Sequence, residues 1–124
     1  MSLVKEETSF TPDDLFAGHV QPVVADSEIV VSGAGVLARG TVLGKITTGG
    51  KLKTVDSAAV DGSQGIYAVL AESVDATSAD VTAPVYYTGE FNEAKLVFGG
   101  TDTADTHRTA ARNIGIFFKS AVTA

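Results

Sequence analysis

The sequence predicts a mostly β domain with one short helix. Its 124 residues include 13 glycines and three prolines but no tryptophan and no cysteine. Short runs of β-branched and apolar residues recur between glycine-rich turns, as is typical of a turn-rich β protein. One segment near the C-terminus has the pattern of a helix. A chain of this length predicts a single folded domain.

The N-terminal segment differs from the rest of the chain. Residues 1–18, MSLVKEETSFTPDDLFAG, are polar and acidic with isolated apolar residues. A segment of such composition is flexible on its own and becomes ordered when it binds a partner. We therefore expect a flexible arm over 1–18 and a single β-rich domain over 19–124. A short amphipathic helix from Thr11 to Phe16 is the alternative for the arm.

The first half of the domain predicts short strands joined by turns. HVQPVV (19–24) and SEIVVS (27–32) are strand candidates, and RGTVLGKIT (39–47) is a third. A hairpin is expected around Gly49-Gly50, because this dipeptide adopts positive φ without steric cost. The following loop contains an Asp61-Gly62 turn.

The next segments carry the most apolar part of the core. GIYAVLAESV (65–74) predicts a central strand. VTAPVYYTGEFN (81–92) predicts another strand, in which Pro84 indicates an edge or a bulge. Tyr86 and Tyr87 point to opposite faces of this strand, so we expect at most one of them in the core. EAKLVFGG (93–100) predicts a further strand or a helical turn.

The helix is expected within TDTADTHRTAARNIG (101–115). Asp102 and Asp105 near its start and two arginines near its end suit the helix dipole, and Gly115 supplies a stop. IGIFFKSAV (114–122) predicts the closing strand. Ile116, Phe117 and Phe118 are consecutive, so both faces of that strand should be covered.

A glycine motif raises the question of nucleotide binding. Residues 33–38, GAGVLA, fit the dinucleotide fingerprint G-x-G-x-x-G/A, with Asp56 further along the chain. The fingerprint requires a helix whose N-terminus receives the pyrophosphate. Gly40, Gly44 and several β-branched residues follow instead, and they favour strand, turn and strand. We therefore expect a β-turn here and no cofactor.

Residues suited to catalysis or metal binding are few. His19 lies in the N-terminal region, and Asp102, Asp105 and His107 lack the spacing of a metal site, so we interpret them as a solvated helix face. No nucleophile, base and oxyanion donor can be assembled, so we expect no metal, no cofactor and no enzymatic activity. The net charge of −6 opposes nucleic-acid binding, and no apolar run is long enough to span a membrane. The absence of cysteine suits synthesis in a reducing cytoplasm.

Three motifs occur in an informative order: GIYAVLA (65–71), YYTGEF (86–91) and THRTAARNIGI (106–116). This order resembles the head decoration proteins of lambda-like tailed bacteriophages. The matching residues are Gly65, Ile66, Ala68, Val69, Ala71, Tyr86, Gly89, Phe91, Arg108, Thr109 and Ala110. The segment 36–56, VLARGTVLGKITTGGKLKTVD, is similar to the strand and hairpin segment of that family. The segment 5–11, KEETSFT, is similar to the family's polar N-terminal arm.

The resemblance implies a β-clip domain, in which a bent β-ribbon forms an incomplete barrel. It also implies homotrimers that bind the major capsid protein on the exterior of the mature head and brace the shell against DNA pressure. Such a protein would be made in the cytoplasm of the bacterial host. Capsid-binding candidates in the arm are Thr8, Ser9, Phe10, Thr11 and Pro12, because this segment has enough β character to add a strand to the shell.

The alternative function is a small-ligand or carbohydrate-binding β-barrel module. Such a module needs an exposed aromatic platform or a modifiable lysine at the tip of a hairpin. Lys51, which follows Gly49-Gly50, is the candidate lysine, although Lys53 lies beside it. A capsid-binding structural protein therefore remains the main hypothesis.

Overall fold

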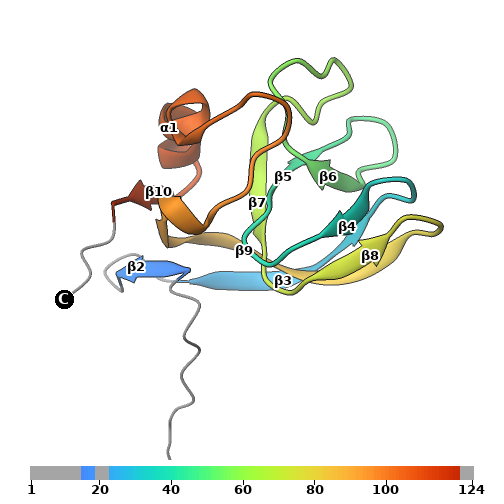
Figure 1. The fold of residues 1–124 in the computed structure, drawn as a ribbon, viewed down its shortest axis with the longest axis horizontal. Coiled ribbons are helices and arrows are strands. Elements are labelled where there is room, and N and C mark those ends of the chain that lie inside the picture. The colour runs from blue at the N-terminus through green and yellow to red at the C-terminus, as the bar shows by residue number, and fades with distance from the viewer. Residues whose placement is uncertain (1–14, 19–22, 121–124) are drawn as a thin grey trace, which may run out of the picture.

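The computed structural model describes residues 15–18 and 23–120 (Figure 1). Nine strands, one 3-10 helix and one α-helix lie in these residues. They are β2 (Phe16–Gly18), β3 (Val24–Val30), β4 (Gly35–Leu37), β5 (Val42–Lys45), β6 (Leu52–Thr54), β7 (Ile66–Leu70), β8 (Val74–Ala76), β9 (Val81–Asn92), η1 (Glu93–Lys95), α1 (Ala104–Asn113) and β10 (Ile116–Lys119). The prediction of a mostly β fold with one helix is confirmed.

Five strands form the barrel. In the order β9, β3, β6, β5, β7, each strand pairs with the next, and β7 pairs back with β9. The contact between β3 and β6 is a single parallel pair, Val30 with Leu52. The barrel is therefore open along most of β3, and the expected incomplete barrel is confirmed.

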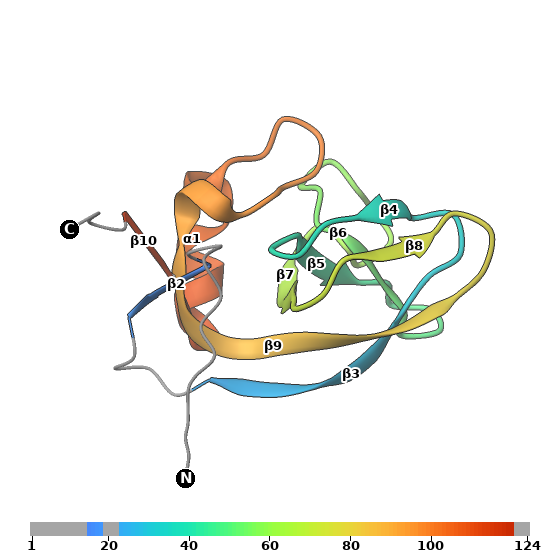
Figure 2. The ribbon, with the colours of Figure 1, turned by 60° about the horizontal axis from the view of Figure 1, so that its bottom comes forward.

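β9 is the longest strand, and it pairs with four others. Its first half lies between β3 and β7, and its last residues lie between β2 and β10. β10 runs parallel to β9, with Ile116 opposite Gly89. Figure 2 shows that β9 bends as it leaves the barrel and continues beside α1. The strand thus joins the barrel to the end of the molecule that carries β2 and β10.

Pro84 lies inside β9 opposite Ser27 of β3, and the bulge between these strands falls elsewhere, at Val24 and Ala25. The carbonyl oxygen of Pro84 accepts a hydrogen bond from the N–H of Ala71, just after β7 ends at Leu70. The nitrogen of Pro84 faces the same side as its oxygen, where no β7 residue requires a donor. Pro84 therefore interrupts no ladder. Of the expected edge or bulge, the bulge is wrong at this position; Pro84 pairs with β3 alone, just beyond the residues of β9 that pair with β7.

Two hydrophobic clusters fill the molecule on either side of β9. One contains Leu15, Phe91, Ile116 and Phe118, and lies beneath α1. The other fills the barrel and includes Val30, Leu43, Leu52 and Val85. Tyr86 packs against the first cluster and Tyr87 against the second. The opposite orientation of the two tyrosines is confirmed, but both are half-buried, so the expectation of at most one core tyrosine is too strict.

A polar cluster lies where the barrel is open. Glu28 of β3 accepts hydrogen bonds from the hydroxyl groups of Tyr87 and Tyr67, the latter at 3.2 Å. Lys45 Nζ lies 4.6 Å from the centroid of the Tyr67 ring and donates to its hydroxyl. The hydrogen bond to Glu28 and partial burial raise the pKa of Tyr87 well above its ordinary value. This cluster joins β3, β5, β7 and β9 by side chains where the backbone ladder is missing.

Several boundaries differ from the expectations. The two short strands expected at 19–24 and 27–32 are a single strand, β3, from Val24, and residues 19–22 lie outside the described part of the chain. The hairpin at Gly49-Gly50 is confirmed, with Lys45 opposite Leu52. The segment 93–100 contains the helical turn η1 and then one bridge, Thr41 with Val97.

Gly44 is packed more tightly than any side chain would allow. A Cβ atom added there would lie 2.3 Å from the carbonyl oxygen of Ser63. We expect Gly44→Ala to lower the free energy of unfolding by about 1–3 kcal/mol, because the backbone of Ser63 must move. Chemical denaturation measures the change. Gly65→Ala is the matched control, since its Cβ would meet no atom within 4 Å; equal losses for the two variants would contradict this packing.

Candidate functional site

The N-terminal segment enters the domain through β2, which is anchored to the end of β9. Phe16 lies opposite Phe91, and the N–H of Asn92 donates to the carbonyl oxygen of Leu15 at 2.7 Å. Leu15 is buried in the cluster beneath α1. The last residues of the expected arm, Leu15 and β2, therefore contact the folded domain. The helix alternative is wrong at Phe16, which lies in a strand.

Aromatic packing strengthens this anchor. The ring of Phe16 packs edge-on against Tyr86, with centroids 4.9 Å apart, and against Phe91 at 5.2 Å. Arg39 donates to the hydroxyl of Tyr86 at 3.0 Å and stacks its guanidinium over the same ring. Gly89 leaves room for these rings, because a Cβ there would approach Phe91 within 3.1 Å. Phe16 is thus held against β9 by ring contacts as well as by strand pairing.

The candidate residues Thr8, Ser9, Phe10, Thr11 and Pro12 lie outside the described residues, as does His19. The arm as the capsid-binding element therefore stays a prediction. The structure does locate where the segment 1–14 leaves the domain, at Leu15 beside the end of β9. Sequence reasoning placed Leu15 and Phe16 in the arm; the apolar Leu-Phe pair was the signal that they belong to the core.

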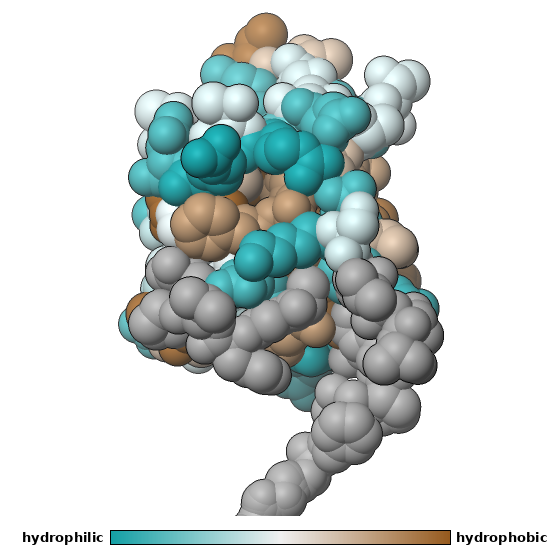
Figure 3. Space-filling view, turned by 90° about the vertical axis from the view of Figure 1, so that its left-hand side faces the viewer, coloured by the Kyte–Doolittle hydropathy of each residue, from teal (hydrophilic) through white to brown (hydrophobic). Residues whose placement is uncertain are grey.

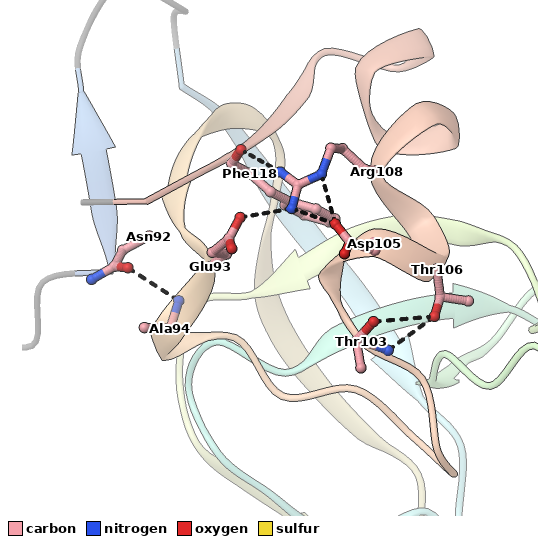
Figure 4. Close-up of polar contacts among 8 residues, drawn as sticks. All are labelled: Asn92, Glu93, Ala94, Thr103, Asp105, Thr106, Arg108 and Phe118. Atoms are coloured by element: carbon pink, nitrogen blue, oxygen red, sulfur yellow. Dashed lines mark hydrogen bonds and ion pairs between the residues drawn. The ribbon is translucent and has the colours of Figure 1, made fainter.

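Arg108 joins three segments at this end of the molecule (Figure 4). Its guanidinium donates to Glu93 of η1 at 2.9 Å, to Asp105 at 2.9 Å and to the carbonyl oxygen of Phe118 at 3.0 Å. Hydrogen bonds to Asp105 and Glu93 raise the pKa of Arg108, so it stays charged. The arginine of the R-T-A motif therefore fastens α1 to β10 and η1, which is a structural role.

A shallow groove lies beside α1 and β10. Thr109, Arg112, Asn113 and Phe117 line this space of about 460 Å³. Figure 3 views this end of the molecule and shows apolar surface between polar side chains. Ile116 and Phe118 face the core, whereas Phe117 lies on the other face of β10 and is half-buried. The groove lacks an acid and a base, so its chemistry is suited to contact rather than catalysis.

The interpretation of Asp102 and His107 as a solvated helix face is wrong. Both side chains are only 4% exposed, and His107 Nε2 lies 2.7 Å from Asp102 Oδ2. Asp102 also accepts hydrogen bonds from the N–H and the hydroxyl of Ser57, and His107 stacks on Phe98. Asp102 precedes the helix, whose first turn is closed instead by the N–H of Thr103 donating to Thr106 Oγ1 (Figure 4). Only Asp105 is exposed as expected.

This pair ties the loop after β6 to α1. The hydrogen bonds from Ser57, followed by the contact with His107, lower the pKa of Asp102. Ser57 donates to Asp102 rather than to His107, so the three residues do not form a nucleophile activated by a base. The sequence offers no local signal for the contact of Ser57 with this pair, because Ser57 is 45 residues from Asp102.

The glycine motif is a turn, as expected. Gly33 and Gly35 have φ values of +91° and +88°, and Gly35–Leu37 forms β4, which pairs with β8. A strand rather than a helix follows the glycines, so the pyrophosphate would have no helix N-terminus. Asp56, the acidic residue further along the chain, accepts from the N–H of Ala58 in its own turn.

The features of a ligand-binding module are not seen in the described residues. Lys51 forms an ion pair with Asp80 at 2.6 Å, which holds its side chain against the neighbouring hairpin. The exposed large hydrophobic residues in this part of the chain are all aliphatic, so they provide no aromatic platform. The same residues contain no group of three or more potential metal ligands. No helix among them is long and apolar enough to cross a membrane.

The fold and these contacts define a small β-barrel of structural or binding type, in which polar side chains fasten segments together. The family model of bacteriophage lambda head decoration protein D matches residues 4–116. The match covers most of the chain, so this chain belongs to the family of lambda-type head decoration proteins of bacteriophages. No curated protein matches it significantly. The family consists of structural proteins of the phage capsid and is not known as a family of enzymes.

We expect Asp102→Asn to weaken the attachment of the 56–63 loop to α1. Loss of charged hydrogen bonds in a buried site should lower the free energy of unfolding at pH 7 by about 1–3 kcal/mol. Because folding lowers the pKa of Asp102, its contribution is complete above the unfolded value near 3.8 and is lost as the pH falls through the folded value. Denaturation from pH 7 down to pH 2 should therefore show less pH dependence for the variant.

The matched control is Glu72→Gln, which removes an exposed carboxylate from the turn between β7 and β8. It should leave stability at pH 7 within about 0.5 kcal/mol of the parent, as surface substitutions do. A parent-like stability and pH profile for Asp102→Asn would contradict the structural role of the pair.

Proposed function

We propose that this protein binds the exterior of the mature phage capsid as trimers and stabilises the shell against the pressure of packaged DNA. Membership of the head decoration family supports a capsid partner, and the major capsid protein is the component that forms such a shell. The single observation that carries the proposal at the level of this chain is the anchored root of the arm at β2. A cementing protein must transmit load between its grip and its body, and β2 provides that connection.

The arm is the proposed grip. Thr8, Ser9, Phe10, Thr11 and Pro12 would add as an extended strand to an edge of the shell, with affinity from main-chain hydrogen bonds and from burial of Phe10. Full burial of a phenylalanine contributes about 1.5–3 kcal/mol, whereas ordering the backbone costs about 1–2 kcal/mol per residue. One arm would therefore bind weakly. Three arms on one trimer raise the effective concentration of the second and third.

The trimer is supported by the apolar surface on β10. Phe117 lies on the face of β10 opposite the core, beside the groove, and Ile114 at the end of α1 is 42% exposed. A neighbouring copy would cover this surface. Charge also suits the exterior position, because three copies carry 3 × (−6) = −18, which keeps the trimer soluble and unattractive to free DNA.

Multi-angle light scattering tests the trimer. We expect a mass of about 38 kDa, three times the 12.7 kDa chain. Phe117→Ser should shift the population toward monomer, because it removes apolar contact area. Val60→Ser, at a residue that is 95% exposed on a loop, should leave the mass unchanged. Monomers at high concentration, with binding to capsids also as monomers, would contradict the proposal.

Deletion of residues 2–14 tests the grip. This variant keeps Leu15 and Phe16, so we expect it to fold and to form trimers with the parent's thermal transition. Decoration of expanded heads, measured by co-sedimentation, should be lost. Phe10→Ala in the full chain should reduce binding by a smaller amount. A deletion variant that still decorates heads with the parent's affinity would show that the arm is not the grip.

A further inference from the structure

We propose that the outer edge of β3 is a second capsid contact, which accepts an extended segment of the major capsid protein by strand addition. This inference rests on the proposed function. It concerns a surface of the folded domain, separate from the arm. The geometry of β3, its side chains and its position beside β2 each point to it.

β3 has one free side over most of its length. All seven residues pair with β9, but on the other side β6 meets β3 only at Val30. The N–H of Val31 donates to the carbonyl oxygen of Leu52, so it faces β6. Peptide groups alternate along a strand, so those of Ala25 and Ser27 face the same side. Within the described part of the chain, no strand pairs with them there.

The side chains of β3 also fit a contact surface. Val24 and Ile29 of β3 are 51% and 42% exposed, and Val23, which precedes the strand, is 44% exposed; they make up three of the seven exposed large hydrophobic residues in the described chain. Natural edge strands are commonly protected by lysine, proline or a covering segment. The sequence of β3, VADSEIV, contains no lysine, arginine or proline. Its charged residues are Asp26 and Glu28, and Glu28 is engaged by the hydroxyl groups of Tyr67 and Tyr87.

The edge of the main sheet at β10 differs from the edge at β3. β10 is its outermost strand on that side, and Arg108 donates to the carbonyl oxygen of Phe118 there. This contact occupies an edge acceptor and places a charged group against the strand. On β3 the Asp26 carboxylate accepts from the N–H of Ser27, so this donor is already engaged. The β10 edge carries a cation, whereas the β3 edge carries a carboxylate beside exposed aliphatic side chains.

The position of β3 identifies its partner. Figures 1 and 2 show β2 and β3 along one margin of the sheet, both outside β9. The segment 1–14 joins the domain at Leu15, immediately before β2. Fourteen extended residues reach at most about 46 Å, so a shell held by the arm lies within that distance of Leu15. Because β3 shares this margin with the root of the arm, we assign the capsid, rather than a second copy of this chain, as its partner.

Charge substitutions on the edge test the inference. Ile29→Lys and Val24→Lys place a solvated ammonium where an added strand would pack. We expect each to weaken co-sedimentation with expanded heads at least tenfold, while the trimer mass and the thermal transition stay as in the parent. Val36→Lys and Val60→Lys are the matched controls, because these valines are 75% and 95% exposed and lie away from β3. They should change binding less than twofold.

Each outcome separates the two proposals. A parent protein that does not bind heads rejects the proposed function and this inference together. A parent that binds, with edge variants that bind equally well, rejects the edge contact alone. Loss of the trimer in Ile29→Lys and Val24→Lys would also overturn the inference, because it would assign the edge to a contact between copies. Equal weakening by the control variants would show a general effect of charge.

Discussion

The structure depends on β9 more than on any other element. Four strands pair with it, and its two ends belong to different parts of the molecule. The first half closes the barrel between β3 and β7, and the second half holds β2 and β10 beside α1. Gly89 has a φ of +151° where these halves meet, and its missing side chain leaves room for the rings of Phe16 and Phe91. The barrel and strand β2 are therefore joined in one continuous structure through β9.

Polar side-chain contacts connect segments that strand pairing does not hold together. Asp102 holds Ser57 and His107 together, and Arg108 joins α1 to η1 and β10. Glu90 is buried on β9 and pairs with Lys119 of β10 at 3.0 Å. These ionised groups serve to position loops and termini, because each is satisfied by neighbours from distant segments. The same use explains why carboxylates and a histidine are present without forming a catalytic set.

Local patterns in the sequence predicted much of the fold. The Gly49-Gly50 hairpin, the apolar strand 66–70, the long strand before Asn92 and the helix follow from turn chemistry and periodicity, and the structure contains all four. The continuation of β3 and the parallel pairing of β10 depend on contacts between distant residues, which local propensity does not encode. The burial of Asp102 and His107 escaped prediction for the same reason. The proposal that residues 8–12 bind the capsid rests on sequence alone.

The central claim is that a barrel and an arm, joined at β2, attach this protein to the outside of the phage head. Electron cryo-microscopy of expanded heads mixed with the purified protein tests it most directly. We predict density for three copies at each local three-fold position of the outer surface, with the arm and β3 facing the shell and the 56–63 loop facing outward. Density that joins the shell through the 56–63 loop, with the arm and β3 directed to solvent, would contradict it.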